Sequence, residues 1–570
     1  MTTFVKKNWV FVLIALIFVV SRLFALGQIY HQDEYKWATI VNPAFGLDLK
    51  SNHPPLVSVI YRAAGEIAGF ENLRLVPIFF GLLVLILSSL VAKRLYGRRA
   101  ALWTALILTV SAYNVIASTQ VDIDGALLPF AGLLLVYSYY RIDFGNVRGR
   151  HNYRWFALVA IALALGLLIK LSFVIWIAAL LTEYVIEHRP SRKTLSRAAG
   201  LIIFLFFFSA CAAFAIIKIF HIADSADFVR YVSHFSTLNF TERNYGQVLF
   251  LSVKAAVLAS PLLLVWYFLV FTKREHLRRY RLWIIFLLYN FLFYFVIFDF
   301  TNRTIERYLM FLIIPSALIA GSLIAGFTSS LSRKSLALSA SIFSALTLGF
   351  SYLVSLKPHD ILPLNPKSEY LSRIKDFNVD FLIPVTGGSG PAGFYVSVPL
   401  VLFASSIALV AIVAFRTLRN PTFKHQLLTL LIALGFAYNI VLSSEFLSGS
   451  LYGSVPRVAS AVIGEAVRNE NIKEVITYYD IGGYELGESK KYLRRFYTDP
   501  MFAKSTRSRL ASYSGYYAVV DFPEIDKQSV IWKYLETCKT TYSAEDGRVK
   551  GYIFNCKNGD RSFFADNKTP

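Results

Sequence analysis

The sequence predicts an α-helical membrane protein that crosses the bilayer many times and carries a small α/β domain at its C-terminal end. Of its 570 residues, 56% are hydrophobic and only 16% are charged, whereas about a quarter of the residues of a soluble protein are charged. The apolar residues form blocks long enough for membrane helices, which need roughly 20 residues each. The residues after 442 are polar and alternate between helix and strand patterns.

The apolar blocks predict about thirteen membrane spans. The first follows Lys6 and Lys7 and is too long for the apolar part of a signal peptide, so we interpret it as an uncleaved span. Only Lys170 separates the fifth block from the sixth. The blocks are 9–27, 75–92, 101–118, 125–140, 155–169, 171–187, 199–219, 248–271, 282–298, 308–326, 336–354, 396–415 and 426–442.

The basic residues support this count. With a cytoplasmic N-terminus, every predicted inner loop is basic, as the positive-inside rule requires. Merging the fifth and sixth blocks would place the last four of these loops outside. The net charge of +22 is therefore a signal of topology and of contact with anionic membrane lipids, and it does not indicate nucleic acid binding. The inner loops carry basic residues in 93–99, 141–154, 189–197, 273–281, 333–334 and 416–424.

Two domains follow from this layout: a membrane domain over 1–442 and an extracytoplasmic α/β domain over 443–570. The membrane domain has three sizeable outer loops, at 28–74, 220–246 and 355–395. The C-terminal domain is expected to contain, in order, a helix at Val458–Asn469, strands at Glu474–Tyr479 and Tyr517–Asp521, a helix at Ser529–Glu536 and a terminal hairpin.

The hairpin brings two cysteines opposite each other. Asp546-Gly547 is a turn signal between the two strands. A three-residue turn at 546–548 would place Cys538 across from Cys556. A disulfide is then plausible outside the cytoplasm, where conditions are oxidising. Two free thiols are the alternative that the sequence leaves open.

Two motifs in the first outer loop suggest chemistry. His31-Gln32-Asp33-Glu34-Tyr35 follows the first span, and Asn52-His53-Pro54-Pro55-Leu56 comes about twenty residues later. A carboxylate at the membrane surface is well placed to accept a proton from a hydroxyl group. Alone, an acidic pair is usually only a solvated surface, and Pro54-Pro55 alone would be a stiff break before a helix.

Together, the Asp33-Glu34 pair and the later His53-Pro54-Pro55-Leu56 resemble the multi-spanning GT-C glycosyltransferases. The likeness is to the branch of protein O-mannosyltransferases and lipid A aminoarabinose transferases. Three further segments agree with the resemblance: Val121-Asp122-Ile123-Asp124, Gly166–Lys170 and Glu306-Arg307-Tyr308. It is best over 9–175 and weak over 355–395 and the C-terminal domain. Leu171-Ser172 follows Lys170 where such proteins often have Gly.

The resemblance implies an enzyme, a hexosyl- or pentosyltransferase. It would move a sugar from a polyprenyl-phosphate donor to a hydroxyl of a protein, lipid or glycan acceptor at the outer face. This is glycosylation of the cell envelope. The absence of a persuasive Gly-x-Gly-x-x-Gly or Walker pattern agrees with a donor carried on lipid rather than on a nucleotide. Neither the donor sugar nor the acceptor can be named from the sequence.

The residues suggest a mechanism. Asp33 would be the general base for an inverting attack on the anomeric carbon, with Glu34 orienting it or helping to bind a metal. The remaining candidates would bind substrate. Asp122 or Asp124 would hold sugar hydroxyls; Lys170, Arg307 beside Tyr308, and Arg62 would neutralise the departing phosphate; His53 would bind phosphate or metal.

Each of these residues also has a purely structural interpretation. Lys170 could extend its ammonium to the membrane surface between two short spans, and the arginines near 307 could pair with neighbouring carboxylates. No cofactor is certain. The oxygen and nitrogen atoms of Asp33, Glu34, Asp122 and His53 suit a divalent ion such as Mg, Mn or Zn, but their spacing demands none of them.

Two other classes of protein compete with the enzyme. A transporter or lipid flippase would show inverted repeats and polar residues at the bilayer midplane. Instead, no clear internal repeat is present, and the notable charges lie at the outer ends of spans. A non-catalytic membrane scaffold would leave the two motifs of the first outer loop unexplained. We therefore expect chemistry at the outer surface.

Overall fold

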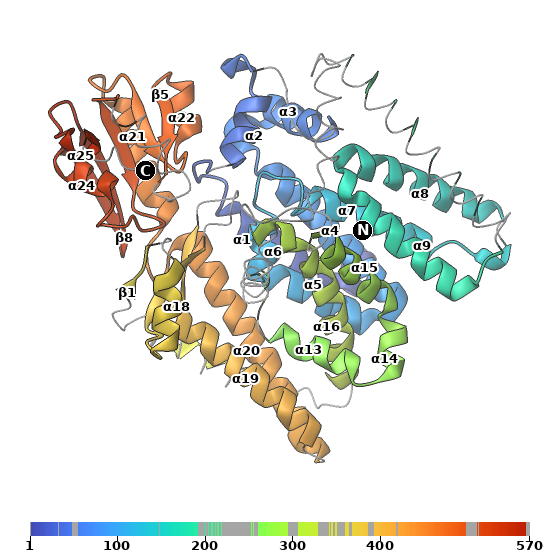
Figure 1. Cartoon of the computed structure of the whole chain (residues 1–570). Coiled ribbons are helices and arrows are strands. Elements are labelled where there is room, and N and C mark those ends of the chain that lie inside the picture. The colour runs from blue at the N-terminus through green and yellow to red at the C-terminus, as the bar shows by residue number, and fades with distance from the viewer. Residues whose placement is uncertain are drawn as a thin grey trace. The chain divides into compact units, whose positions relative to one another are not determined.

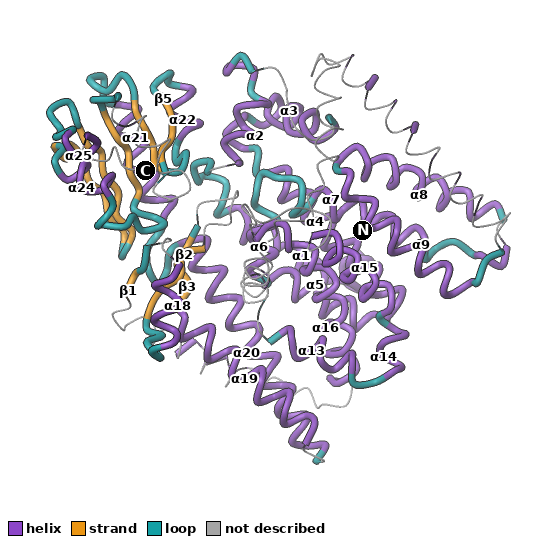
Figure 2. The backbone as a smooth tube through the Cα atoms, in the orientation of Figure 1, coloured by secondary structure: helices purple, strands orange, loops and turns teal. Residues whose placement is uncertain are grey.

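Helices dominate the computed structural model of the chain (Figures 1 and 2). Close contacts divide it into two compact units. A helical unit comprises Met1–Leu23, Ile40–Ser344 and Ser406–Asn439, and a mixed unit comprises Phe24–Thr39, Ala345–Ser405 and Ile440–Pro570. The structure describes residues 2–31, 33–47, 55–146, 149–191, 196, 200, 203, 207–208, 211, 214–215, 218, 252, 255, 260, 262–294, 306–328, 341, 344–345, 348–349, 360–363, 367–385, 393–417, 420–497, 510 and 512–565.

The helical unit is built from apolar helices joined by short turns. Its helices are α1 (Thr2–Leu23), α3 (Leu56–Ala68), α4 (Leu75–Tyr96), α5 (Arg98–Val110), α6 (Ala112–Ala117), α7 (Leu127–Tyr139), α8 (Arg150–Ile169), α9 (Val174–His188), α13 (Leu263–Phe271), α14 (Arg274–Arg279), α15 (Arg281–Leu292), the 3-10 helix η6 (Glu306–Leu312) and α16 (Ile313–Thr328). Two long helices, α19 (Val398–Thr417) and α20 (Pro421–Ser448), each have residues in both units.

Within the described part of the chain, six helical segments are long and apolar enough to cross a membrane. They are Phe70–Tyr96, Arg150–Ile169, Leu171–His188, Tyr308–Thr328, Val398–Thr417 and Gln426–Ser448. The predicted helical membrane architecture is therefore confirmed, while the number of thirteen spans stays a prediction. Much of the blocks 199–219, 248–271 and 336–354 lies outside the described residues.

Two helix boundaries bear on the site. The fifth and sixth predicted spans are separate helices, because the chain leaves α8 at Lys170 in an extended conformation (φ −159°, ψ 135°) before α9 begins. The single span predicted for 101–118 is instead two helices. Ser111 ends α5 and caps α6, since its hydroxyl accepts a hydrogen bond from the Asn114 amide at 3.4 Å.

The mixed unit contains a five-stranded sheet in the order β5-β4-β6-β8-β7. β4 pairs in parallel with both β5 and β6, whereas β8 pairs antiparallel with β6 and β7. The carboxyl ends of β4, β5 and β6 therefore lie at one edge of the sheet. The strands are β4 (Val475–Tyr478), β5 (Tyr492–Phe496), β6 (Tyr516–Val520), β7 (Lys539–Asp546) and β8 (Val549–Asn555).

Helix α21 (Val455–Arg468) packs across this sheet (Figure 1). Its buried Val458 and Val462 approach Gly551 of β8 so closely that a Cβ there would lie 2.6–2.7 Å from them. Short helices α22 (Gly483–Glu488), α24 (Val530–Glu536) and α25 (Ser562–Ala565) complete the domain. The expected helices, strands and hairpin are present; β5 and α22 were not predicted.

The unit also includes α18 (Lys367–Lys375) and a three-stranded sheet in the order β1-β2-β3, with β1 (Asp360–Ile361), β2 (Phe381–Val385) and β3 (Phe394–Ser397). The remaining helix, α2 (Asp33–Val41), begins in this unit. In the terminal hairpin, Cys538 and Cys556 form a disulfide. The turn has two residues rather than three, because Asp546 pairs with Val549, and a bulge near Thr541 restores the register that aligns the cysteines.

Candidate active site

The loop between α6 and α7 presents the second acidic motif. After α6 ends at Ala117, the chain folds back so tightly that a Cβ on Gly125 would lie 2.1 Å from the Ala117 carbonyl oxygen, so only glycine fits there. The Tyr61 hydroxyl of α3 donates a hydrogen bond to the Asp122 carbonyl oxygen at 2.9 Å. The Asp122 residue is only 4% exposed. The loop thus buries Asp122 and turns the chain at Asp124.

A buried arginine supports the same loop. Arg22 in the last turn of α1 is fully buried. Its guanidinium donates to the Thr109 and Leu108 carbonyl oxygens at 2.7 and 3.2 Å and to the Ser118 hydroxyl at 3.1 Å. The carbonyls belong to the C-terminal end of α5, where a positive charge is stabilised by the helix dipole. Arg22 therefore fastens α1 to the segment that leads into the acidic loop.

Lys170 binds Asp124 in the helical unit. Its Nζ donates to both carboxylate oxygens at 2.7 Å, and the two side chains are 16% and 9% exposed. The chain can leave α8 here because Gly166 has no side chain: a Cβ there would lie 2.4 Å from the Phe173 ring. The Gly-x-x-x-Lys pattern thus has a physical reason, since the glycine lets the following turn fold back on α8.

This ion pair borders a pocket that is partly open to solvent. Among the described residues that line the pocket, Asp124 is the acidic one. Ser172 and Asn290 add polar groups, and Trp176, Tyr294 and Tyr308 add aromatic faces. The Lys170 ammonium lies 5.7 Å from the centroid of the Tyr308 ring. The arrangement is a mostly apolar pocket in which the Asp124 carboxylate, held by Lys170, forms part of the wall.

In the mixed unit, Asp33 and Glu34 begin α2. Acidic residues are favoured in the first turn of a helix, where the amide groups point outward. The Asp33 carboxylate pairs with Lys36 one turn later, and its side chain is 21% exposed. Glu34 is completely buried. The two neighbours therefore differ: Asp33 reaches solvent, while Glu34 faces the interior.

The other predicted residues are less informative. Arg62 donates to Glu66 of the same helix at 2.9 Å and is partly exposed. His53 and the Arg307 side chain lie outside the described residues. Among the residues that are described, no group of three or more His, Cys, Asp or Glu side chains is arranged to hold a metal ion. Metal binding by Asp33, Glu34, Asp122 and His53 thus stays a prediction.

Sequence patterns missed Arg22 and the aromatic wall of the pocket. Arg22 interrupts an apolar first span, and a cation at such a position is costly enough to deserve a partner. From that cost, a buried partner for Arg22 could have been predicted. Asn290 and Tyr294 lie among apolar residues of α15 and just after it, and nothing in their spacing distinguishes them from packing residues.

Part of the chain resembles a known protein family. Residues 52–216 match the family model described as dolichyl-phosphate-mannose-protein mannosyltransferase. This stretch contains Asp122, Asp124 and Lys170, whereas Asp33 precedes it. No curated protein sequence matches the chain.

Solved ArnT structures share the fold. ArnT from Cupriavidus metallidurans in the apo state aligns with a TM-score of 0.55 and 16% identity, covering 96% of this chain and 98% of that chain. ArnT bound to undecaprenyl phosphate gives a TM-score of 0.54 with the same identity and coverage. AglB from Archaeoglobus fulgidus has a TM-score of 0.48 and 12% identity over 96% of this chain and 74% of its own. The family model covers less than half of the chain, and the ArnT structures show a shared fold.

Proposed function

We propose that this protein transfers a sugar from a polyprenyl-phosphate donor to an acceptor hydroxyl at the outer face of the membrane, with inversion at the anomeric carbon. The observation that carries the proposal is the Lys170–Asp124 pair at the wall of an apolar pocket in the helical unit. A lipid phosphate has both an apolar chain and an anionic head, and this pocket offers surfaces for each. The fold shared with a protein solved with undecaprenyl phosphate bound supports the same donor class.

Lys170 would stabilise the leaving group. Its ammonium has three N–H donors, and the Asp124 oxygens accept two hydrogen bonds from Nζ. A phosphate oxygen would take the third. As the bond between the anomeric carbon and the phosphate oxygen breaks, negative charge grows on the phosphate, and a preorganised cation beside it lowers the barrier. Asp124 would hold the ammonium in position, which replaces the sugar-binding role expected from the sequence.

Asp33 would act as the general base. Its carboxylate takes the proton of the acceptor hydroxyl while the hydroxyl oxygen forms a bond to the anomeric carbon and the polyprenyl phosphate leaves. Attack from the face opposite the leaving group inverts the configuration. The partial exposure of Asp33 supports this role, because an acceptor has to reach the carboxylate. The buried Glu34 would position the start of α2 or bind a metal.

The orientation in the membrane is part of the proposal. The N-terminus would lie in the cytoplasm and the C-terminal domain outside it, as the basic loops indicate. A reporter enzyme fused after Pro570 should be active only if that end is exported. Activity of a cytoplasm-specific reporter at the same position would contradict this topology.

The transfer reaction can be tested with purified protein in liposomes. The probes are a panel of labelled undecaprenyl-phosphate sugars offered with protein, lipid and glycan acceptors. We expect Asp33→Asn to lower the transfer rate by about 100-fold or more, within the usual contribution of a general base. Glu66→Gln is a matched control, since Glu66 is also a carboxylate of the first outer loop paired within its own helix.

Equal transfer rates for Asp33→Asn and the wild type would refute the role of Asp33 as general base. No transfer from any donor would refute the proposed reaction. Treatment with EDTA followed by added Mg²⁺, Mn²⁺ or Zn²⁺ decides in the same assay whether a divalent metal is required.

A further inference from the structure

The loop after β4 holds a buried carboxylate that the proposed reaction does not use. Asp480 is 1% exposed. Its oxygens accept a hydrogen bond from the Tyr492 hydroxyl at 2.5 Å and form an ion pair with Arg495, both on β5. Tyr479 and Asp480 both have left-handed backbone conformations, with φ of 57° and 60°. Non-glycine residues adopt this conformation at a cost, so surrounding contacts must hold it.

This cluster joins the loop after β4 to both ends of β5, since Tyr492 is the first residue of that strand and Arg495 lies near its carboxyl end. Taking the Asp480 carboxylate out of water costs hydration, and the partly exposed Arg495 offsets only part of that cost. The strained loop and the buried carboxylate are therefore better explained by something that they position than by stability alone.

The segment packed against this cluster is the chain's own first outer loop. The Tyr35 ring of α2 packs edge-on against Tyr492 with centroids 5.4 Å apart, and Tyr30 packs in the same way on Tyr484 at 5.2 Å. Gly483 makes room, since a Cβ there would lie 3.1 Å from the Tyr35 ring. The Asp480 carboxylate thus fixes Tyr492, and Tyr492 in turn supports Tyr35.

Electrostatic coupling points the same way. Burial raises the pKa of Tyr497 to about 12, and the negative charges of Asp480 and Asp33 add to that rise while Arg495 opposes it. Tyr497 follows β5, so the Asp33 charge is felt at the carboxyl edge of the sheet. Burial and the Asp480 charge also raise the pKa of Tyr35, two residues after Asp33. One set of charges and rings therefore links this edge to the start of α2.

We propose that the Asp480–Tyr492–Arg495 cluster is a positioning device that seats helix α2 and thereby sets the place of the Asp33 carboxylate for the transfer reaction. The inference rests on the proposed function only for the role of Asp33; the seating itself concerns the mixed unit alone. A displacement of about 1 Å at a reacting group can cost roughly 100-fold in rate. The C-terminal domain would then act on the reaction step itself, in addition to any selection of acceptors.

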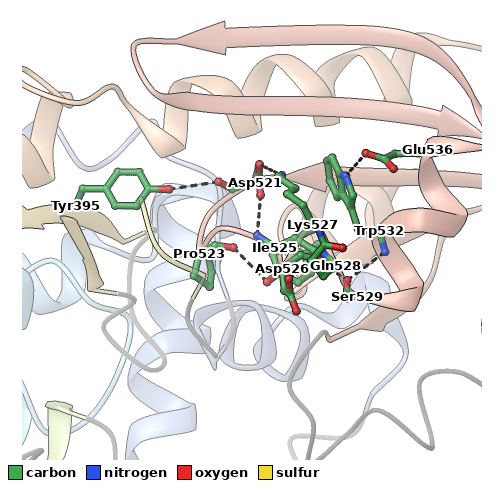
Figure 3. Close-up of polar contacts among 11 residues, drawn as sticks. Tyr395, Asp521, Pro523, Ile525, Asp526, Lys527, Gln528, Ser529, Trp532 and Glu536 are labelled. Carbon is green, nitrogen blue, oxygen red and sulfur yellow. Dashed lines mark hydrogen bonds and ion pairs between the residues drawn. The ribbon is translucent and has the colours of Figure 1, made fainter. Parts of the chain in front are cut away.

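The test compares two carboxylates that follow neighbouring parallel strands, Asp480 after β4 and Asp521 after β6. Asp480→Asn removes the carboxylate that accepts the hydrogen bond of Tyr492. Asp521→Asn removes a similar pair after β6, where the carboxylate binds Lys527 at 2.5 Å and the Ile525 amide at 2.8 Å (Figure 3). Both of these partners of the Asp521 carboxylate belong to its own loop. A third variant, Tyr492→Phe, keeps the ion pair and removes only the hydroxyl, so it stays informative if Asp480→Asn folds poorly.

We expect Asp480→Asn to lower turnover by about 10- to 100-fold while the KM for the donor changes less than about twofold, because the donor pocket is untouched. Tyr492→Phe should show a smaller loss of the same kind, and Asp521→Asn should keep nearly the wild-type turnover. Equal losses for Asp480→Asn and Asp521→Asn would mean a general effect on the domain and would overturn the proposal. So would wild-type turnover in both Asp480→Asn and Tyr492→Phe.

A second measurement does not depend on activity. Trypsin can cleave after Lys36 only when α2 opens locally, since proteases require unfolded backbone, and the Lys36 side chain is 51% exposed. Mass spectrometry of the purified protein should show faster cleavage after Lys36 in Asp480→Asn and Tyr492→Phe than in the wild type or Asp521→Asn. An unchanged rate would refute the seating of α2. If the wild type transfers sugar from no donor, the proposed function is wrong. The cleavage rates still show whether the Asp480 cluster holds α2 in place.

Discussion

Asp124 in the helical unit and Asp480 in the mixed unit are both largely buried carboxylates bound to a cation, yet their surroundings differ. Asp124 binds a lysine at the C-terminal end of α8 and lines a pocket that is partly open to solvent. Asp480 binds an arginine of the neighbouring strand, 37% of whose side chain is exposed, and tyrosine rings pack around the cluster. The first pair lies beside a pocket that is partly open to solvent, and the second is packed against protein.

The difference separates two uses of a buried charge. An ammonium beside a pocket can exchange part of its contacts for a phosphate, so it suits a step in which charge develops. A guanidinium holds a carboxylate in a fixed planar geometry, so it suits a support that must not move. We therefore expect the Lys170 pair to affect binding and reaction together, and the Asp480 cluster to affect turnover alone.

The largest effect is expected at Lys170. Lys170→Ala should lower the transfer rate by about 100- to 1000-fold, as the loss of one preorganised charge contact does in other enzymes. Asp124→Asn should cost less, since the ammonium remains although its position is less fixed. The measurement is transfer of labelled sugar in liposomes, with Lys93→Ala, an exposed lysine at the end of α4, as the control. A loss of transfer rate of less than threefold in Lys170→Ala would contradict the expected difference between the Lys170–Asp124 pair and the Asp480 cluster.

The disulfide tests whether the C-terminal domain has a stability of its own. A cross-link enclosing a loop of about 15 residues contributes roughly 3 kcal/mol in the chain-entropy model, and Cys538 and Cys556 are 18 residues apart. The double variant Cys538→Ser/Cys556→Ser should expose the terminal strands to protease at a lower temperature. Circular dichroism at 222 nm should show the membrane helices melting as before. If both signals shift equally, the two regions unfold together.

Arg22 offers the matching test in the helical unit. Arg22→Lys keeps the charge but loses the planar set of donors that reaches Ser118 and two carbonyl oxygens. A loss of about 1–3 kcal/mol is expected, as for hydrogen bonds to charged groups. The readout is the midpoint of heat-induced aggregation. Arg94→Lys is the control, because this arginine donates to the Tyr140 carbonyl oxygen at an exposed position; an equal shift in both would contradict the support given to the acidic loop.

The smallest effect concerns pH. Burial, and then the charge of Asp521, raises the pKa of Glu524 to about 7 from its ordinary 4.5. The folded domain therefore holds a proton that the unfolded chain releases between these values. This contribution to stability is complete below about pH 4.5 and is lost as the pH rises through about 7.

The domain should thus melt at a lower temperature at pH 8 than at pH 5, and Glu524→Gln should flatten this dependence. Glu470→Gln, an exposed carboxylate of the same domain, should leave it as in the wild type. A slope that survives in Glu524→Gln would assign the dependence to another group.

Local structure in both units could be predicted from the sequence. The break at Lys170 follows from one charge between two apolar blocks, and the terminal hairpin follows from its turn residues. The contact between Lys170 and Asp124 could not be predicted, because 46 residues separate them and no pattern distinguishes Asp124 from Asp122. Only the fold decides that Asp122 is buried while Asp124 borders the pocket.

The Asp480 cluster was missed for a different reason. Tyr478-Tyr479-Asp480 has the composition of a strand end and turn, and β5 carries Arg494 and Arg495 within only five residues, which hides its strand pattern. Charged residues are nonetheless usual on an edge strand, where they discourage pairing with other chains. Since β5 is the outermost strand of the sheet, that rule could have been used to predict it as a strand.

The packing of Tyr30 and Tyr35 on residues 484 and 492 has a consequence for biosynthesis. The ribosome makes α2 among the first residues of this sequence, long before the strands on which it rests. Helix α2 therefore lacks its final neighbours until the C-terminal domain has been made and folded. Catalytic competence would then be acquired only late in synthesis, and a chain truncated within the domain would be inserted in the membrane yet inactive.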